Sequence, residues 1–92
     1  MRFRFLEAFR RQCRDLNLRE RAALLGLVLD LQATLADPHR HSGAGLRKLH
    51  SSGIWEVRVG LSLRLLFRLE DAEATFIFVG SHDEVKRFLK SL

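Results

Sequence analysis

Four stretches of the chain have the hydrophobic pattern of β-strands. Residues 2–5 read Arg-Phe-Arg-Phe, and residues 54–59 and 63–69 carry apolar side chains at every second position. A period of two sends successive side chains to opposite faces of a sheet, so each stretch predicts a strand with a buried face. Residues 74–79 are apolar on both faces, which predicts a strand in the interior of the sheet.

Two segments after the first strand have a helical period instead. Between that strand and Asn17, apolar side chains recur every three or four residues, which predicts a short amphipathic helix. Asn17 and Glu20 form a capping box that begins a second helix, and Pro38 ends it. Its apolar face holds Leu24, Leu27, Val28, Leu31 and Leu35. Leu25 and Leu29 lie outside that face, so we expect another chain to cover part of this helix.

A third helix is predicted at the C-terminal end. Ser81 and Glu84 repeat the spacing of a capping box. The apolar side of this helix holds Val85, Phe88, Leu89 and Leu92. The pattern as a whole predicts an α+β domain in which a twisted, mostly antiparallel sheet packs against the two N-terminal helices.

The register of the first hairpin follows from its apolar faces. A three-residue loop at 60–62 makes the apolar faces of the two flanking strands coincide. The same register sets Arg58 directly opposite Arg64. Like charges in that position are destabilising, so we expect a negative group between them. Glu56 is one candidate, and an acidic protein partner or an RNA phosphate is the other.

The second hairpin is predicted to have a four-residue loop at 70–73. That loop pairs Phe67 with Phe76 and Leu65 with Phe78 on the core face. On the other face it sets Arg68 beside Thr75 and Arg64 beside Val79. Both hairpins therefore direct arginine side chains to the face that the N-terminal helices do not cover.

Composition narrows the class of protein. A length of 92 residues corresponds to a single domain, residues 1–92. One cysteine excludes an internal disulfide, and the apolar stretches are too short to span a bilayer, so we expect a cytoplasmic protein without a membrane partner. The net charge is +5, and thirteen of the sixteen basic residues are arginines, which bind phosphate in a bidentate manner.

His82 falls in the first turn of the third helix, close to the strand end beside Arg64. Cleavage of RNA by its own 2′-hydroxyl requires a group that accepts a proton, cations that stabilise the phosphorane, and an acid for the leaving oxygen. A histidine beside clustered arginines supplies these groups. The alternative is that His82 only occupies the start of a helix.

Four segments, in this order, resemble the RelE/ParE superfamily of toxins. They are residues 45–49 (Gly-Leu-Arg-Lys-Leu), 54–59 (Ile-Trp-Glu-Val-Arg-Val), 64–67 (Arg-Leu-Leu-Phe) and 80–85 (Gly-Ser-His-Asp-Glu-Val). The last is similar to the ending of YafQ-like members. The resemblance covers nearly the whole chain and implies a RelE-like fold with the order β-α-α-β-β-β-α.

The resemblance also implies a function. Members are toxins of type II toxin–antitoxin pairs, and most cleave mRNA on the ribosome without a metal ion. We therefore expect no metal and no cofactor, and three partners: an acidic, partly disordered antitoxin, mRNA and the ribosome. By position, the resemblance carries over Arg64, His82, Arg47 and Lys48. With Arg58 from the hairpin register and Lys86 as an added charge, the expected catalytic residues are Arg58, Arg64, His82 and Lys86. The expected RNA-binding residues are Arg47, Lys48, His50, Arg68 and Arg87. The oligomeric state stays open.

The chain departs from the family pattern in two ways. It contains no tyrosine, whereas several RelE-type toxins carry a tyrosine near the C-terminus. Lys86 stands where YafQ-like members have an aromatic residue. These departures favour an alternative of another class: a non-cleaving binding protein of the same fold, either a ParE-like inhibitor of DNA gyrase or an inactive homologue that binds antitoxin.

Overall fold

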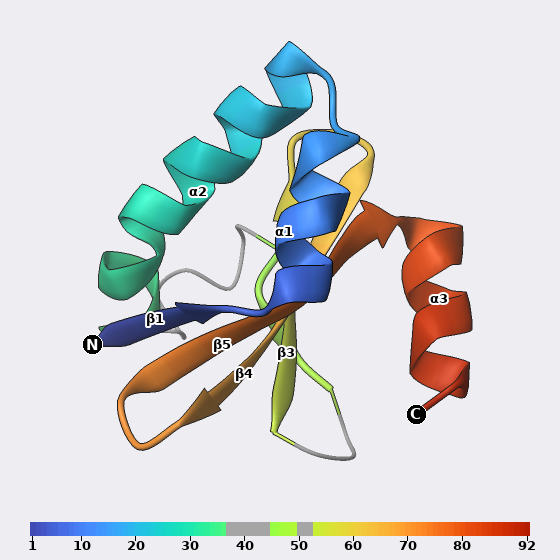
Figure 1. Ribbon diagram of the computed structural model, residues 1–92. Coiled ribbons are helices and arrows are strands. Elements are labelled where there is room, and N and C mark those ends of the chain that lie inside the picture. The colour runs from blue at the N-terminus through green and yellow to red at the C-terminus, as the bar shows by residue number, and fades with distance from the viewer. Residues whose placement is uncertain (37–44, 50–52) are drawn as a thin grey trace.

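A computed structural model describes residues 1–36, 45–49 and 53–92, and within them the chain forms three helices and a five-stranded sheet (Figure 1). Along the chain the elements are β1 (Arg2–Phe5), α1 (Glu7–Arg14), α2 (Leu18–Ala36), β2 (Arg47–Lys48), β3 (Ile54–Val59), β4 (Leu63–Glu70), β5 (Glu73–Ser81) and α3 (His82–Lys90). The predicted α+β class is confirmed. The sequence pattern did not reveal β2, because two residues are too short for a period.

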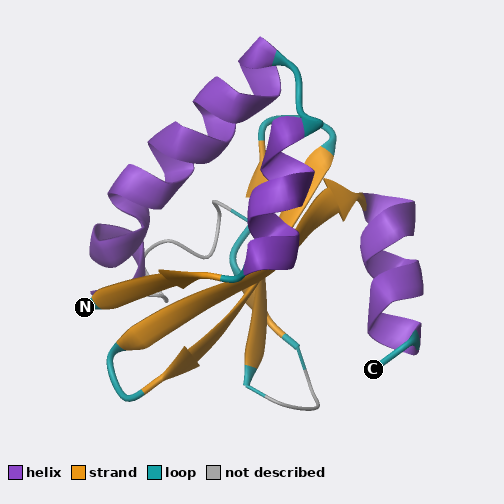
Figure 2. Ribbon diagram, viewed as in Figure 1, coloured by secondary structure: helices purple, strands orange, loops and turns teal. Residues whose placement is uncertain are grey.

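The strands lie in the order β1-β5-β4-β3-β2. All neighbouring strands are antiparallel except β1 and β5, which are parallel. The prediction of a mostly antiparallel sheet is therefore confirmed, as is the interior position of residues 74–79, since β5 has a neighbour on each side. The first strand of the chain thus forms one edge of the sheet, beside the last strand (Figure 2).

The register predicted for the first hairpin is confirmed. Val59 pairs with Leu63 and Arg58 pairs with Arg64 across β3 and β4. Gly60 opens the connecting loop with a φ of +62°, a conformation that costs glycine nothing and strains other residues.

The register predicted for the second hairpin is correct only near its turn. Phe67 pairs with Phe76 as expected, but a β-bulge between Leu66 and Phe67 shifts the rest of the ladder. Leu66 then pairs with Phe78, Leu65 with Val79 and Arg64 with Gly80, so the predicted Leu65–Phe78 and Arg64–Val79 pairs are wrong. A bulge adds one residue to one strand and turns the following side chains to the other face.

The turn of this hairpin is also tighter than predicted. Glu70 pairs with Glu73, and only Asp71 and Ala72 connect the strands, with φ values of 48° and 61°. Two positive φ values are typical of the type I′ turn, whose twist matches that of the flanking strands. The tighter turn leaves the register next to it unchanged.

Each face of the sheet carries its own apolar core. On one face α1 and α2 contribute Phe9, Leu24 and Leu31, which pack on buried strand residues such as Phe67 and Phe76. The two N-terminal helices therefore cover one face, as predicted. Burial of each such side chain contributes about 1.5–3 kcal/mol, so this face supplies most of the hydrophobic stabilisation.

The smaller core lies on the opposite face, under α3. Val85 of α3 packs against Ile54 and Leu66, which are buried in the sheet. The bulge brings Phe78 to this face, where its ring stacks on Phe88 with the centroids 4.5 Å apart. Because α3 covers only part of the face, strand side chains beyond it stay accessible.

Both predicted capping boxes are present. The Glu20 N–H donates to Asn17 Oδ1 and the Asn17 N–H donates to Glu20 Oε1, each at 2.8 Å. At α3 the Glu84 N–H donates to Ser81 Oγ at 3.2 Å, and the Ser81 N–H donates to Glu84 Oε1 at 2.8 Å. The Ser81 backbone N–H, with the Ser81 hydroxyl adding to its effect, lowers the pKa of the Glu84 carboxyl group, because a hydrogen bond to a carboxylate favours its ionised form. Among the described residues, no helix combines the length and apolarity needed to cross a membrane.

Candidate nucleic-acid interface

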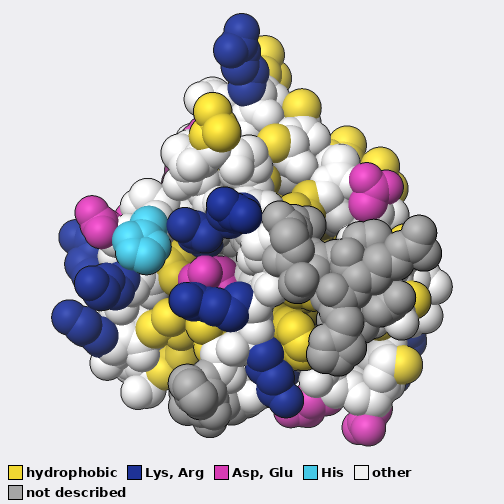
Figure 3. All heavy atoms as spheres, turned by 180° about the vertical axis from the view of Figure 1, so that it is seen from behind, with side chains coloured by type: hydrophobic (Ala, Val, Ile, Leu, Met, Phe, Trp, Pro, Cys, Tyr) yellow, Lys and Arg dark blue, Asp and Glu magenta, His cyan; other side chains and the backbone are white. Residues whose placement is uncertain are grey.

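Three arginines share the face of the sheet on which α3 packs. Arg58 and Arg64 are a direct pair on β3 and β4. Arg47 joins them from β2, since it pairs with Glu56 on β3, and paired residues point to the same face. With Gly45, Leu46 and Glu56 they line a hollow of about 270 Å³. Figure 3, which shows the molecule from behind, has basic side chains gathered around an acidic one on this face.

Glu56 lies buried between the arginines, with 5% of its surface exposed. Its Oε1 atom is 3.5 Å from Arg47 Nη2 and 3.8 Å from Arg64 Nη1. Of the negative groups expected between Arg58 and Arg64, Glu56 is therefore present, although it pairs with Arg64 and Arg47. Arg58 forms no ion pair within the described residues, so its charge is available to a ligand.

Gly45 sets the position of the Arg58 side chain. Its φ is +84°, and a Cβ atom at this position would overlap Arg58 Nε and press on Arg58 Cγ at 3.1 Å. The Arg58 side chain thus lies across the Gly45 backbone, and only glycine leaves room for it. This glycine was noted in the sequence as part of a motif, but its contact with Arg58 depends on the path of the chain between α2 and β3.

His82 lies at the same end of the sheet as Arg64. Arg64 pairs with Gly80 and Leu63 with Ser81, and His82 follows as the first residue of α3. It is exposed, and it is the one histidine among the described residues. The histidine visible in Figure 3 lies next to the group of basic side chains. The predicted association of His82 with the arginines is thus matched by the geometry of the strand end.

The other predicted site residues lie at varying distances from this group. Lys86 is one helical turn after His82, so the two side chains share a side of α3. Arg87, the next residue, is rotated about 100° from Lys86 around the helix axis. Arg68 is on the same sheet face as Arg64 but about 13 Å further along β4. Lys48 pairs with Trp55, which directs it to the opposite face. His50 lies outside the described residues, as do His39 and His41.

The charge on this face suits the binding of an anion. Three guanidinium groups and one buried carboxylate leave an excess of positive charge in a hollow the size of a phosphate and its neighbours. Within the described part of the chain, no three histidine, cysteine, aspartate or glutamate side chains are grouped as metal ligands would be.

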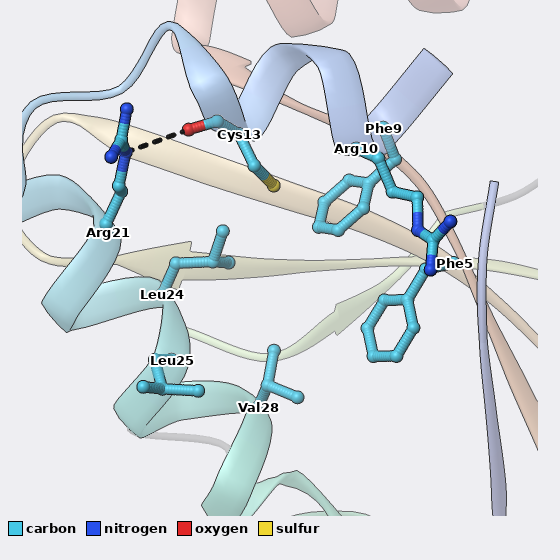
Figure 4. A pocket seen from close by; sticks show the side chains of 8 residues that line it. All are labelled: Phe5, Phe9, Arg10, Cys13, Arg21, Leu24, Leu25 and Val28. Carbon is cyan, nitrogen blue, oxygen red and sulfur yellow. Dashed lines mark hydrogen bonds between the residues drawn. The ribbon is translucent and has the colours of Figure 1, made fainter. Parts of the chain in front are cut away.

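A second hollow, of about 300 Å³, lies on the other side of the molecule between α1 and α2 (Figure 4). Its lining is apolar apart from two arginines: Phe5, Phe9, Arg10, Cys13, Arg21, Leu24, Leu25 and Val28. Arg21 Nε donates a hydrogen bond to the Cys13 carbonyl at 3.2 Å. Burial raises the pKa of the Cys13 thiol, which keeps it in the unreactive protonated form.

The apolar surface continues along α2. Leu25 is 60% exposed and Leu29 is 73% exposed, although both are large apolar side chains. The sequence pattern placed them outside the core face, and the structure agrees.

Comparison of the sequence with protein-family models and with curated proteins gives no match. Comparison of the fold does. A chain of the RelBE2 toxin–antitoxin complex from Mycobacterium tuberculosis superposes with a TM-score of 0.67 at 24% identity, over 88% of this chain and 96% of that one. A chain of the intact RelBE complex from Escherichia coli gives 0.61 at 23% identity, over 87% and 94%. The chain has the RelE-like toxin fold.

A third structure extends the comparison to another toxin. YafQ from Escherichia coli superposes with a TM-score of 0.60 at 20% identity, over 92% of this chain and 98% of YafQ. Each solved chain is spanned almost completely, and between 87% and 92% of this chain is covered, so the likeness extends over most of it. The predicted resemblance to RelE-type and YafQ-type toxins is confirmed at the level of the fold.

Proposed function

We propose that this protein is the toxin of a type II toxin–antitoxin pair, and that it cleaves mRNA on the ribosome. The observation that carries the proposal is the grouping of Arg47, Arg58 and Arg64 on one open sheet face, with His82 at the adjoining strand end. The neighbours in fold come from toxin–antitoxin complexes, which supports the toxin role. Because mRNA and ribosomes are its targets, we propose that it acts in the cytoplasm.

The proposed reaction uses the substrate's own nucleophile. The 2′-hydroxyl attacks the adjacent phosphorus, the 5′-oxygen leaves, and a 2′,3′-cyclic phosphate and a 5′-hydroxyl result. Arg58 and Arg64 stabilise the negative charge that develops on the phosphorane oxygens. His82 accepts the proton of the 2′-hydroxyl and returns it to the leaving 5′-oxygen, and Lys86, one turn away, adds positive charge beside it. No metal ion is required for these steps.

Other basic side chains hold the RNA backbone in this proposal. Arg47 contacts a phosphate next to the scissile one, while Lys48, Arg68 and Arg87 bind flanking phosphates or ribosomal RNA. These side chains are exposed on three different elements, which suits a surface that spans several nucleotides. Such contacts contribute affinity that falls as salt concentration rises.

The antitoxin has a different place in the proposal. The hollow between α1 and α2 is apolar with Arg10 and Arg21 in its lining, and Leu25 is exposed beside it. An acidic amphipathic segment would bury the leucine and pair with the arginines. We therefore propose that the antitoxin covers this side of the molecule, which accounts for the apolar surface of α2.

The test of the nuclease function is primer extension on a reporter mRNA after brief induction of the wild type and of His82→Ala. Discrete cuts that depend on translation, and that fade in the variant, are the expected result. Intact mRNA despite growth arrest would contradict cleavage. A Lys90→Ala variant serves as a control, because Lys90 is an exposed cation in the last turn of the same helix and has no part in the proposed site.

One observation favours a non-cleaving binding protein as the second candidate. The chain has no tyrosine, and the aromatic ring of Phe88 on α3 stacks on Phe78 in the small core. A base would thus find no free phenyl or phenol ring on α3 to stack on. Filamentation and DNA damage after induction, with protein synthesis intact, would indicate a gyrase inhibitor. Binding of an antitoxin without any toxicity would indicate an inactive homologue.

A further inference from the structure

Among the described residues, Glu56 is the one acidic side chain that lines the hollow formed with Arg47, Arg58 and Arg64. A carboxylate is a costly group to bury, and it is retained only where cations or hydrogen bonds compensate for the lost water. Glu56 also places a negative charge in the hollow that is proposed to bind RNA, where it would repel phosphate groups. The position of Glu56 between Arg47 and Arg64 therefore indicates that this carboxylate has a function in the site.

The contacts of Glu56 define that role. A single oxygen, Oε1, faces both Arg47 Nη2 at 3.5 Å and Arg64 Nη1 at 3.8 Å. Because Arg47 comes from β2 and Arg64 from β4, the carboxylate joins the two strands that flank β3. Arg47 is 67% exposed in its side chain and Arg64 is 29% exposed, so each keeps guanidinium surface free for a ligand.

The floor beneath Glu56 fixes it in place. Glu56 pairs with Leu66, which is fully buried. Ile54, two residues before Glu56 on β3 and therefore on the same face, is 2% exposed. Apolar neighbours on the same face leave the carboxylate few alternative positions, and they weaken competition from water for its partners. A rigid acceptor restricts the rotation of the guanidinium groups that face it.

We infer that Glu56 is a positioning residue that orients Arg64, and with it Arg47, toward the scissile phosphate. This inference rests on the proposed function. Without Glu56, Arg47, Arg58 and Arg64 would repel one another, and their side chains would spread toward solvent. Glu56 lowers the total positive charge of the hollow but holds the arginines in one geometry, and transition-state stabilisation depends on such fixed geometry more than on net charge.

The inference separates RNA binding from cleavage. In Glu56→Gln the side chain keeps its size, but the hollow gains one positive charge, so affinity for RNA should stay the same or rise. Cleavage should become slower, because Arg64 is no longer held. A residue that only stabilised the fold would instead lower both together. We expect the single-turnover rate constant to fall at least tenfold, while the Kd for an RNA with a 2′-deoxy group at the cleavage site changes less than threefold.

Glu73→Gln is the matched control. Glu73 also pairs with an arginine, at 3.6 Å from Arg2 Nη2, but it lies near the turn between β4 and β5. We expect the control to leave both constants within twofold of the wild type. A Glu56→Gln protein that cleaves at the wild-type rate would overturn the inference, as would equal losses in rate and affinity.

A second measurement needs neither cleavage nor a folded variant. The guanidinium ¹⁵N–¹H signals of the wild-type protein report how freely each arginine rotates. We expect slow rotation for Arg64 relative to Arg58, which has no ion pair within the described residues. Equal, fast rotation of the two would overturn the inference. If the wild type fails to cleave mRNA but Arg64 rotates slowly, the nuclease proposal fails and the positioning by Glu56 stands.

Discussion

Gly45 lies so close beneath Arg58 that no other residue fits there without moving the arginine, since an added Cβ would overlap Arg58 Nε. Gly45→Ala therefore combines backbone strain with displacement of a predicted catalytic side chain. The strain of a positive φ costs about 1–2 kcal/mol. We expect cleavage to fall by tenfold or more, measured by primer extension at equal amounts of folded protein.

Gly53→Ala separates these two effects. Gly53 also has a positive φ, +69°, but nothing lies within 4 Å of an added Cβ. It should lose similar stability and keep its activity. Equal activity losses in the two variants would show that strain alone is responsible, and that Arg58 is not displaced.

Arg64 is expected to be the most sensitive arginine. Arg64→Ala should lower cleavage a hundredfold or more, the scale on which a lost contact to a charged transition state acts. The thermal midpoint should change little, because the side chain is partly exposed. Arg4→Ala, an exposed arginine on the edge strand β1 that has no part in the proposed site, is the control and should retain activity within threefold. Persistent toxicity of Arg64→Ala would contradict the proposed chemistry.

The cap of α3 gives a stability prediction with a definite pH dependence. The folded state lowers the pKa of Glu84, so its contribution is present above the unfolded pKa, about 4.3, and is lost as the pH falls through the lower folded value. Urea denaturation of Glu84→Gln should show the deficit against the wild type at pH 7, and the deficit should shrink toward pH 3. A deficit that does not vary with pH would mean that packing, not ionisation, explains it.

The Ser81 hydroxyl makes the other hydrogen bond of the capping box at the start of α3. Ser81→Ala removes the acceptor of the Glu84 N–H and should destabilise the protein by about 1 kcal/mol. Ser62→Ala, in the exposed loop between β3 and β4, should change the free energy of unfolding by less than about 0.5 kcal/mol.

The two sides of α2 should respond differently to truncation. Leu31 is 1% exposed and Leu29 is 73% exposed. Leu31→Ala should cost about 2–5 kcal/mol in urea denaturation, and Leu29→Ala should cost less than about 0.5 kcal/mol. If Leu29→Ala instead weakens binding to the cognate antitoxin without changing stability, the proposed cover of α2 gains support.

The sequence predicted those parts of the fold that depend only on residues close together in the chain. A few neighbouring residues determine each capping box, at Asn17 and at Ser81. The same is true of the register that pairs Arg58 with Arg64. The bulge beside Phe67 was not predictable in this way. The bulge turns the Phe78 side chain to the face under α3, where it packs against Phe88. This contact forms only in the folded chain.

In the candidate site, too, the residues that could be placed from the sequence are those connected by short segments of the chain. Arg64, Arg58 and His82 could be placed together because a hairpin and a helix start connect them. Lys48 was expected with Arg47, but strand alternation sends adjacent residues to opposite faces, and the strand itself was too short to recognise. The burial of Glu56 depends on β2, so its role could not be read from its own strand.

The parallel pairing of β1 with β5 sets an order for folding. Arg2 has its partner in Glu73 and Phe5 in Phe76, so the first strand waits until nearly all of the chain has been synthesised. Contacts between such distant positions slow folding, because a long loop must close before they form. During translation, the nascent chain therefore carries an unpaired edge strand with two arginines, and the sheet gains this edge only after residues 73–76 have emerged.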